Sequence, residues 1–324
     1  MALLSLEISE KEYNELTELL IESPSPYVDS QSFFKFIEGK DKYLPHRLII
    51  ALDELKYNFS PLTGVLIKNL PVGNQENIPP KNCSSVPSKY NFISEAITAV
   101  IASRVGYIFG YKQERDGHII QNIVPEVGRE YINSSEGSAV PLELHVDNGY
   151  LDCYPDHVGL FCLIGDTNGV AKTSVFEAST LLSVLSPASI EQLYTASFCI
   201  RFSYSFSKKL TDEEWSIPRP IFTGKFDNPQ IRVKFGVTKG INSRAQSALD
   251  ELIAKSCDEN LAYSVNLEKG DLIILSNKRA IHGRSKFQAQ FNRNDRWLHR
   301  VYTFSDPWIW REYFQKDNRV LNFN

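Results

Sequence analysis

The sequence lacks the features that mark several common classes of protein. Its five cysteines are an odd number, lie far apart and never form a CxxC pair, which argues against both a disulfide framework and a structural zinc site. No apolar run approaches the roughly 18 residues that a membrane-spanning helix needs, and the N-terminus has no basic segment followed by an apolar one. We therefore expect a cytoplasmic protein that is neither secreted nor embedded in a membrane.

A positive charge excess, internal repeats and nucleotide-binding motifs are also absent. The 35 lysines and arginines are outnumbered by 39 aspartates and glutamates, and no basic block is long enough to follow a phosphate backbone, so nucleic acid is not an expected partner. No GxGxxG motif follows a strand pattern, and strands and helices do not alternate strictly, as they do in a parallel sheet.

What is present indicates a helical first third and a β-rich remainder. Apolar spacing predicts helices over residues 9–22, 45–57 and 92–109, with a strand at residues 64–67. From about Gly117 the sequence changes to short apolar runs separated by turn residues, which is typical of a sandwich or barrel. The expected strands cover residues 119–124, 142–145, 158–164, 173–176, 231–235, 262–267, 272–275 and 297–304, with helical insertions at 187–197 and 243–257.

We therefore predict one domain of mainly β structure, with a double-stranded β-helix (jelly-roll) core and flanking helices. Its expected parts are a mostly helical N-terminal elaboration over residues 1–116, the core over residues 117–304 and a tail over residues 305–324. The hydrophobic residues, 42% of the chain, are spread evenly along it, which favours a single domain over two.

A histidine and a carboxylate stand two residues apart at the end of an expected strand. Because side chains alternate along a strand, His145 and Asp147 point to the same face, and one ion could bind both. His282, shortly after the apolar run 272–275, is the best placed third ligand. Two imidazoles and one carboxylate leave coordination positions open, an arrangement suited to iron(II). The pattern alone is also compatible with a hydrogen-bonded structural pair, and the other histidines are expected to be structural: His46, His118, His157 and His299.

The segment after His282 makes the assignment more specific. The sequence reads HGR at residues 282–284 and DRWLHR at residues 295–300, with Arg296 fourteen residues beyond His282. This order resembles the clavaminate synthase-like, TauD-related branch of the iron(II)- and 2-oxoglutarate-dependent oxygenases, whose members include free amino-acid hydroxylases. The resemblance covers roughly residues 121–304.

The resemblance implies roles for several residues. It makes Arg296 the anchor for the distal carboxylate of 2-oxoglutarate, a task suited to a planar and permanently charged group, and Thr173 the hydroxyl that shares this carboxylate. Arg300 matches the arginine that holds the α-carboxylate of the substrate, and Gln121 and Ser135 match substrate-contacting positions. From strand alternation alone, the two arginines could equally face solvent.

Two departures from the family pattern bear on the reaction and the substrate. Many relatives carry glutamate where this chain has Asp147; because a carboxylate is still present, no ligand position is left for chloride, which argues against halogenation. Lys234 and Gly236 stand where relatives that act on basic amino acids carry acidic residues. We therefore expect Lys234 to contact an acidic or neutral substrate, the alternative being a lysine that is simply solvated.

The resemblance thus implies a dioxygenase that couples oxidative decarboxylation of 2-oxoglutarate to hydroxylation of an unactivated carbon of a free L-amino acid or a close derivative. Iron(II), 2-oxoglutarate and dioxygen are the expected cofactor and cosubstrates, and a small molecule is the expected partner. Two alternatives stay open. The same chemistry could act on a carrier-tethered or protein-borne residue, or the three metal ligands could hold zinc in a non-catalytic or hydrolytic jelly-roll protein.

Overall fold

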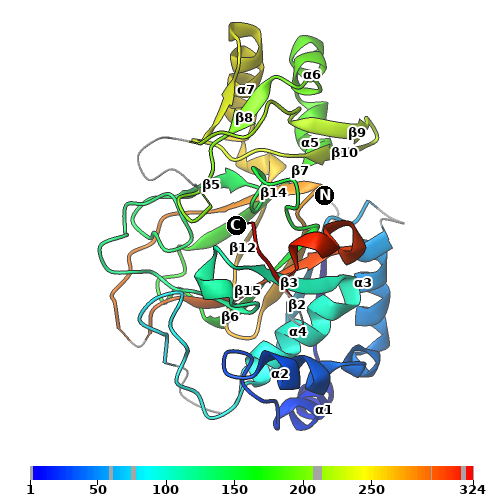
Figure 1. The fold of residues 1–324 in the computed structure, drawn as a ribbon, viewed down its shortest axis with the longest axis vertical. Coiled ribbons are helices and arrows are strands. Elements are labelled where there is room, and N and C mark those ends of the chain that lie inside the picture. Colours follow the sequence, from blue (N-terminus) through cyan, green and yellow to red (C-terminus); the bar gives the residue numbers. More distant parts are fainter. Residues whose placement is uncertain are drawn as a thin grey trace.

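Two β-sheets form the middle of the molecule, and two groups of helices lie at its opposite ends (Figure 1). The computed structural model describes residues 3–57, 61–73, 78–206, 214–292, 294–314 and 319–323. The larger sheet has eight strands in the order β1-β2-β13-β6-β15-β3-β16, with β4 also paired to β15, and the smaller sheet has the order β12-β7-β14-β5. No helix among these residues is both long and apolar enough to cross a membrane.

The strands of the larger sheet come from all parts of the chain. They are β1 (Leu3–Glu7), β2 (Gly64–Lys68), β3 (Tyr107–Tyr111), β4 (Gln121–Ile123), β6 (His157–Ile164), β13 (Leu272–Ser276), β15 (Trp297–Phe304) and β16 (Val320–Leu321). The smaller sheet consists of β5 (Leu142–His145), β7 (Lys172–Glu177), β12 (Tyr263–Asn266) and β14 (Ala280–Arg284). Two separate two-stranded sheets pair β8 (Phe198–Ile200) with β11 (Thr238–Gly240), and β9 (Phe222–Lys225) with β10 (Asn228–Ile231); only the second pair is a hairpin.

The helices form two groups. The first group packs beside the larger sheet and contains α1 (Glu10–Leu20), α2 (Ser30–Ile37), α3 (His46–Tyr57) and α4 (Ile93–Val105), and the second contains α5 (Ala178–Ser183), α6 (Pro187–Leu193) and α7 (Ser243–Lys255). Short 3₁₀ helices are η1 (Lys40–Tyr43), η2 (Arg115–Gly117), η3 (Glu259–Leu261) and η4 (Pro307–Tyr313). Helix α1 begins where predicted because Ser9 and Glu12 form a capping box. Helix α2 was not expected.

The helix predicted over residues 92–109 is too long. Helix α4 ends at Val105, and residues 107–111 form β3, which pairs with β15. A side chain at Gly106 would place its Cβ 2.5 Å from the carbonyl oxygen of Phe304, so only glycine permits this close approach of the two segments. The aromatic residues of β3 also suit a strand. Helix α4 itself is buried along most of its length against the larger sheet.

The strand predicted over residues 231–235 is displaced. The hairpin strand β10 ends at Ile231, and the next residues run beside β5 with one antiparallel bridge, between His145 and Lys234. The Arg232 guanidinium donates hydrogen bonds to the carbonyl oxygens of Gly149 and Leu151, at 2.5 and 2.6 Å, and so ties this segment to the turn after β5. Strands β1 and β14 were not predicted at all.

A buried ionic cluster lies between α4 and β15. The Lys89 ammonium is 2.8 Å from a Glu95 carboxylate oxygen, and His299 Nε2 is 3.5 Å from the other. Both glutamate and histidine side chains are fully buried. Burial alone would raise the pKa of Glu95, but Lys89 and His299 outweigh it and hold that pKa below its usual range. Glu95 is therefore ionised, and it compensates the buried Lys89.

Replacing Glu95 with glutamine should lower the free energy of unfolding by about 3–5 kcal/mol near neutral pH, because Lys89 would stay buried without its counterion. A carboxyl whose pKa is lowered by folding contributes stability above its unfolded pKa, about 4.3 for glutamate, and loses it as the pH falls. Urea unfolding at several pH values should therefore show the gap between wild type and Glu95→Gln shrinking below pH ~4. The exposed Glu18→Gln serves as control; a gap that persists unchanged in acid would contradict this account.

Candidate active site

The three residues nominated as metal ligands lie together in the structure. His145 ends β5, His282 is in the middle of β14, and the strand register pairs these two histidines directly. The ligand atoms of His145, Asp147 and His282 all lie within 4.8 Å of one another, and all three side chains are buried. The geometry therefore permits one ion to bind all three side chains.

His145 is held in the form that a metal requires. Its Nδ1 is 2.7 Å from the backbone carbonyl oxygen of Glu143, which assigns the proton to Nδ1 and leaves Nε2 available as a ligand. Burial, with a further contribution from the His282 ring, lowers the pKa of His145 to about 3. The imidazole is therefore neutral near physiological pH, and only neutral imidazole binds a metal.

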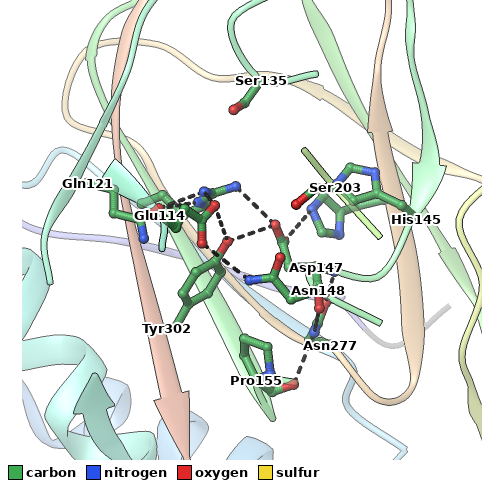
Figure 2. Close-up of polar contacts among 12 residues, drawn as sticks. Glu114, Gln121, Ser135, His145, Asp147, Asn148, Pro155, Ser203, Asn277 and Tyr302 are labelled. Carbon is green, nitrogen blue, oxygen red and sulfur yellow. Dashed lines mark hydrogen bonds and ion pairs between the residues drawn. The ribbon is translucent and has the colours of Figure 1, made fainter. Parts of the chain in front are cut away.

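The two carboxylate oxygens of Asp147 have different surroundings. Its Oδ1 accepts hydrogen bonds from Arg300 Nη1 at 3.0 Å and from the Tyr302 hydroxyl at 3.1 Å (Figure 2). Its Oδ2 lies 3.2 Å from His282 Nε2 but accepts no hydrogen bond. Asn277 fixes the backbone of Asp147 by accepting from its N–H and donating to its carbonyl, at 2.8 and 3.1 Å.

The donor set fits a divalent metal. Burial alone would raise the pKa of Asp147, but Arg300 and His282 outweigh it and keep that carboxyl well below its usual pKa. A buried and ionised oxygen without a hydrogen bond is costly unless a cation satisfies it. A two-histidine, one-carboxylate set on one face leaves positions open for further ligands and is typical of non-haem iron(II) sites.

A cationic end of the site lies beside these ligands. Arg296 is buried, and within the described part of the chain its guanidinium has no hydrogen bond or ion pair. Arg284 is also buried, and among the described residues it donates only to the carbonyl oxygens of Ser285 and Val140. Burial and the neighbouring Arg296 lower the pKa of Arg284 to about 9. Thr173 stands opposite Arg284 in the β7–β14 register. Two buried cations without an anion require a negatively charged ligand.

Arg300 is, by contrast, well bonded within the protein. Its Nε and Nη2 both donate to Gln121 Oε1, at 2.9 and 2.6 Å, and Nη2 also donates to Glu114 (Figure 2). Burial alone would lower the pKa of Arg300, but Tyr302, Glu114 and Asp147 raise it above its ordinary value. One N–H of Nη1 is left over from the five donors that an arginine carries. Arg300, in β15, and Arg296, directly before β15, are thus both buried and do not face solvent.

The site residues line two adjoining cavities. The larger, about 520 Å³, is lined by Glu114, Lys234 and other polar residues, and the smaller, about 40 Å³, by Thr173 and Arg296. Both are also lined by Ser135, His145, Asp147 and Arg300. Because the smaller cavity takes residues from both sheets, the sheets face each other across it. A further cavity, about 730 Å³, includes none of the nominated residues.

Each remaining nominated residue has a defined place. Gln121 is fully buried and accepts from Arg300. Ser135 accepts a hydrogen bond from Arg115 Nη2 at 2.8 Å and lines both cavities. Lys234 lines the larger cavity; burial lowers its pKa, and the nearby Asp147 acts against this effect. The structure therefore brings all nominated residues to one region, and their individual roles stay predictions.

Several site residues escaped the sequence reasoning. Arg284 had a usable signal, since it stands two residues after His282 and so shares its face if the segment is a strand. Tyr302 had the same relation to Arg300. Glu114 and Asn277 carried no signal, because the first reaches Arg300 from 186 positions away and the second reaches Asp147 from 130.

Comparisons with known proteins agree with this geometry. Residues 94–302 match the family model described as taurine catabolism dioxygenase TauD, TfdA family. The chain is 31% identical to an L-lysine 3-hydroxylase of Catenulispora acidiphila, over 81% of this chain and 73% of that protein. It is 27% identical to an L-asparagine oxygenase of Streptomyces coelicolor, over 76% of this chain and 72% of that protein.

A comparison with solved structures finds the same fold in known proteins. A solved structure of an asparagine oxygenase in complex with Fe(II), 2S,3S-3-hydroxyasparagine and succinate superposes with a TM-score of 0.89 at 24% identity, covering 99% of both chains. The predicted enzyme class, a 2-oxoglutarate-dependent non-haem iron dioxygenase, is confirmed. Since the family model covers residues 94–302, more than half of the chain, and includes the three metal-ligand candidates, the chain belongs to the taurine catabolism dioxygenase TauD, TfdA family.

Proposed function

We propose that this chain is an iron(II)- and 2-oxoglutarate-dependent dioxygenase that hydroxylates an unactivated carbon of a free L-amino acid or a close derivative. The observation that carries the proposal is a buried cluster of two histidines and one aspartate beside Arg296, a buried guanidinium with no hydrogen bond or ion pair among the described residues. The activities by which the L-lysine 3-hydroxylase and the L-asparagine oxygenase are named support an amino acid as the substrate.

Iron(II) and 2-oxoglutarate supply the oxidising chemistry: 2-oxoglutarate loses carbon dioxide and takes one atom of dioxygen to become succinate, and the other atom enters a C–H bond of the substrate. The chain contributes binding and orientation. His145, Asp147 and His282 hold the iron, and Arg296 and Thr173 bind the distal carboxylate of 2-oxoglutarate. Arg284 adds a second positive charge at the same place.

On the substrate side, Arg300 binds the α-carboxylate through the N–H of Nη1 that the protein leaves unused. Gln121 holds the guanidinium in place from the other edge. Glu114, which also accepts from Arg300, lines the larger cavity and provides an acceptor for the substrate ammonium. Ser135 and Lys234 contact the remainder of the substrate from the cavity wall.

The finer description of the fold belongs to the same proposal. We infer that the two facing sheets form a jelly-roll core and that residues 1–324 make up one oxygenase domain, because strands from the first 116 residues are integral to the larger sheet. Four of the five cysteines are buried as free thiols, which is consistent with a reducing cytosol.

A free amino acid is favoured over a carrier-tethered or protein-borne residue. The reason is the N–H of Arg300 Nη1 that no described residue accepts: a free carboxylate would accept it in a charge-assisted hydrogen bond, which an amide or thioester does not provide. A zinc site of the same three residues does not explain Arg284 and Arg296, which lack an anion within the described structure.

The proposal is tested by anaerobic reconstitution with iron(II), addition of 2-oxoglutarate and each free L-amino acid in turn, and admission of oxygen. We expect one or a few amino acids to stimulate succinate formation and to gain one oxygen atom by mass spectrometry. Stimulation only by a carrier-bound or peptide-bound residue would replace the free substrate with a tethered one. Activity with zinc and without oxygen would refute the oxygenase reading.

A further inference from the structure

We propose that the substrate carries a carboxylate in its side chain, as aspartate, glutamate or a close derivative does, and that Lys234 binds that carboxylate. The inference rests on the proposed function and narrows it to one class of amino acid. It is carried by the place of Lys234 beside a metal ligand and by the charges that line the larger cavity.

The backbone directs Lys234 to the metal candidates. Lys234 and His145 form an isolated antiparallel bridge, flanked by hydrogen bonds from Val146 N to Val233 O at 2.9 Å and from Phe235 N to Leu144 O at 3.0 Å. In such a pair the two side chains lie on the same face of the strands and come close together. Lys234 therefore extends into the cavity on the side where His145 presents its ring.

Within the described residues, no carboxylate pairs directly with Lys234, and its ammonium has no hydrogen bond. Glu114 and Asp147 bond to Arg300, and Glu136 pairs with Arg115, so these acids act on Lys234 only at longer range. A half-buried ammonium facing an enclosed site is stabilised when a bound ligand supplies the negative charge.

The charged side chains that line the larger cavity are slightly more cationic than anionic. The cations are Arg115, Arg129, Arg201, Lys234 and Arg300, and the anions are Glu114, Glu136, Asp147 and Glu214. An arginine or lysine substrate would place its own charge near Lys234, and like charges in an enclosed site repel.

A carboxylate also fits better than an amide. Either group could accept a hydrogen bond from Lys234, but only the carboxylate compensates its charge. Hydrogen bonds between two charged groups are about twice as strong as neutral ones. The inference therefore predicts a preference between two substrates of nearly equal size, aspartate over asparagine or glutamate over glutamine.

The test measures binding as well as turnover. L-Asp, L-Glu, L-Asn, L-Gln, L-Arg and L-Lys are titrated anaerobically into the iron(II) and 2-oxoglutarate complex, and the change in its visible absorbance gives the dissociation constants. We expect one acidic amino acid to bind roughly 10- to 100-fold more tightly than its amide. Succinate formation and a mass gain of one oxygen atom should follow the same order.

Two variants test whether Lys234 causes the preference for the acidic amino acid over its amide. Lys234→Met, which keeps the length of the side chain, should weaken binding of the acidic amino acid roughly 10- to 100-fold and leave its amide within about threefold. Lys234→Glu should reverse the order in favour of L-Lys or L-Arg. The matched control is Lys225→Met on the exposed hairpin, which should change neither. Thermal unfolding checks that each variant is folded.

The outcomes separate the inference from the proposed function. Stimulated succinate formation with a basic or amide amino acid, unaffected by Lys234→Met, would overturn the acidic substrate and leave the amino-acid dioxygenase standing. If no amino acid perturbs the absorbance or stimulates succinate formation, the proposed function fails and the inference fails with it. A preference for an acidic amino acid that Lys234→Met does not reduce would also overturn the role of Lys234.

Discussion

Replacing Arg296 with alanine should raise the dissociation constant of 2-oxoglutarate by at least about 30-fold, because truncating one partner of a buried charge pair costs 2–5 kcal/mol. Arg296 is buried and has no hydrogen bond or ion pair within the described residues, so we expect the distal carboxylate of 2-oxoglutarate to be its anionic partner. The variant should still chelate the 2-oxo acid end through the metal. The loss therefore concerns one end of the cosubstrate only.

Pyruvate makes this prediction sharper, because it keeps the 2-oxo acid and lacks the distal carboxylate. Wild type should bind 2-oxoglutarate far more tightly than pyruvate, and Arg296→Ala should bind the two about equally in an anaerobic absorbance titration. Ligand-induced thermal stabilisation should fall in parallel, since it depends on the same dissociation constant. The control is Arg244→Ala at the exposed start of α7. A variant that still discriminates as wild type does would remove Arg296 from this role.

Arg284→Ala distinguishes two arrangements of the same site. If the distal carboxylate lies between the two guanidinium groups, Arg284→Ala and Arg296→Ala should lose similar affinity for 2-oxoglutarate. If Arg284 acts only as a neighbouring charge, its loss should be several-fold at most, since exposed or indirect charge effects are small. Arg284 and Arg296 line the same cavity of about 40 Å³, so the two cations lie near each other, and Arg296 adds to the effect of burial in lowering the pKa of Arg284.

Alternation and the family resemblance together located the site in the sequence. Alternation predicted a shared face for His145 and Asp147, whereas Arg296 was identified through the resemblance, from its place fourteen residues after His282. The structure brings all these residues to the adjoining cavities. Strand β14 was missed because its polar residues, His282 and Arg284, face the interior of the site and hide the apolar pattern of a strand.

Two kinds of feature could not be predicted from the sequence: the ends of buried helices and the contacts between residues far apart in the chain. The overlong helix at residues 92–109 arose because an all-round apolar helix and a buried strand share one continuous apolar run, and periodicity cannot separate them. The Arg300 network was out of reach for a different reason. Glu114 stands in the turn before η2, and only the closed fold brings it to β15.

The second large effect concerns the metal. Asp147→Ala should remove bound iron and lower succinate formation by more than about 100-fold, because altering even the groups that merely orient metal ligands costs 10- to 100-fold. His145→Ala should behave in the same way. Asp147→Glu should retain iron, since either carboxylate can serve as the third ligand. Iron content after anaerobic desalting gives a direct readout besides activity.

His46→Ala provides the matched control, because this histidine lies exposed at the start of α3, far from the site in sequence and bonded to none of its residues. It should keep full iron content and full succinate formation. Loss of iron in a folded Asp147→Ala variant would assign Oδ2 of Asp147, which accepts no hydrogen bond, to the metal. Unchanged iron content would mean that the buried His282–Asp147 contact at 3.2 Å is a structural pair. In that case Arg300, Tyr302 and Asn277 would be read as supports of that pair, and the iron would have to be sought elsewhere.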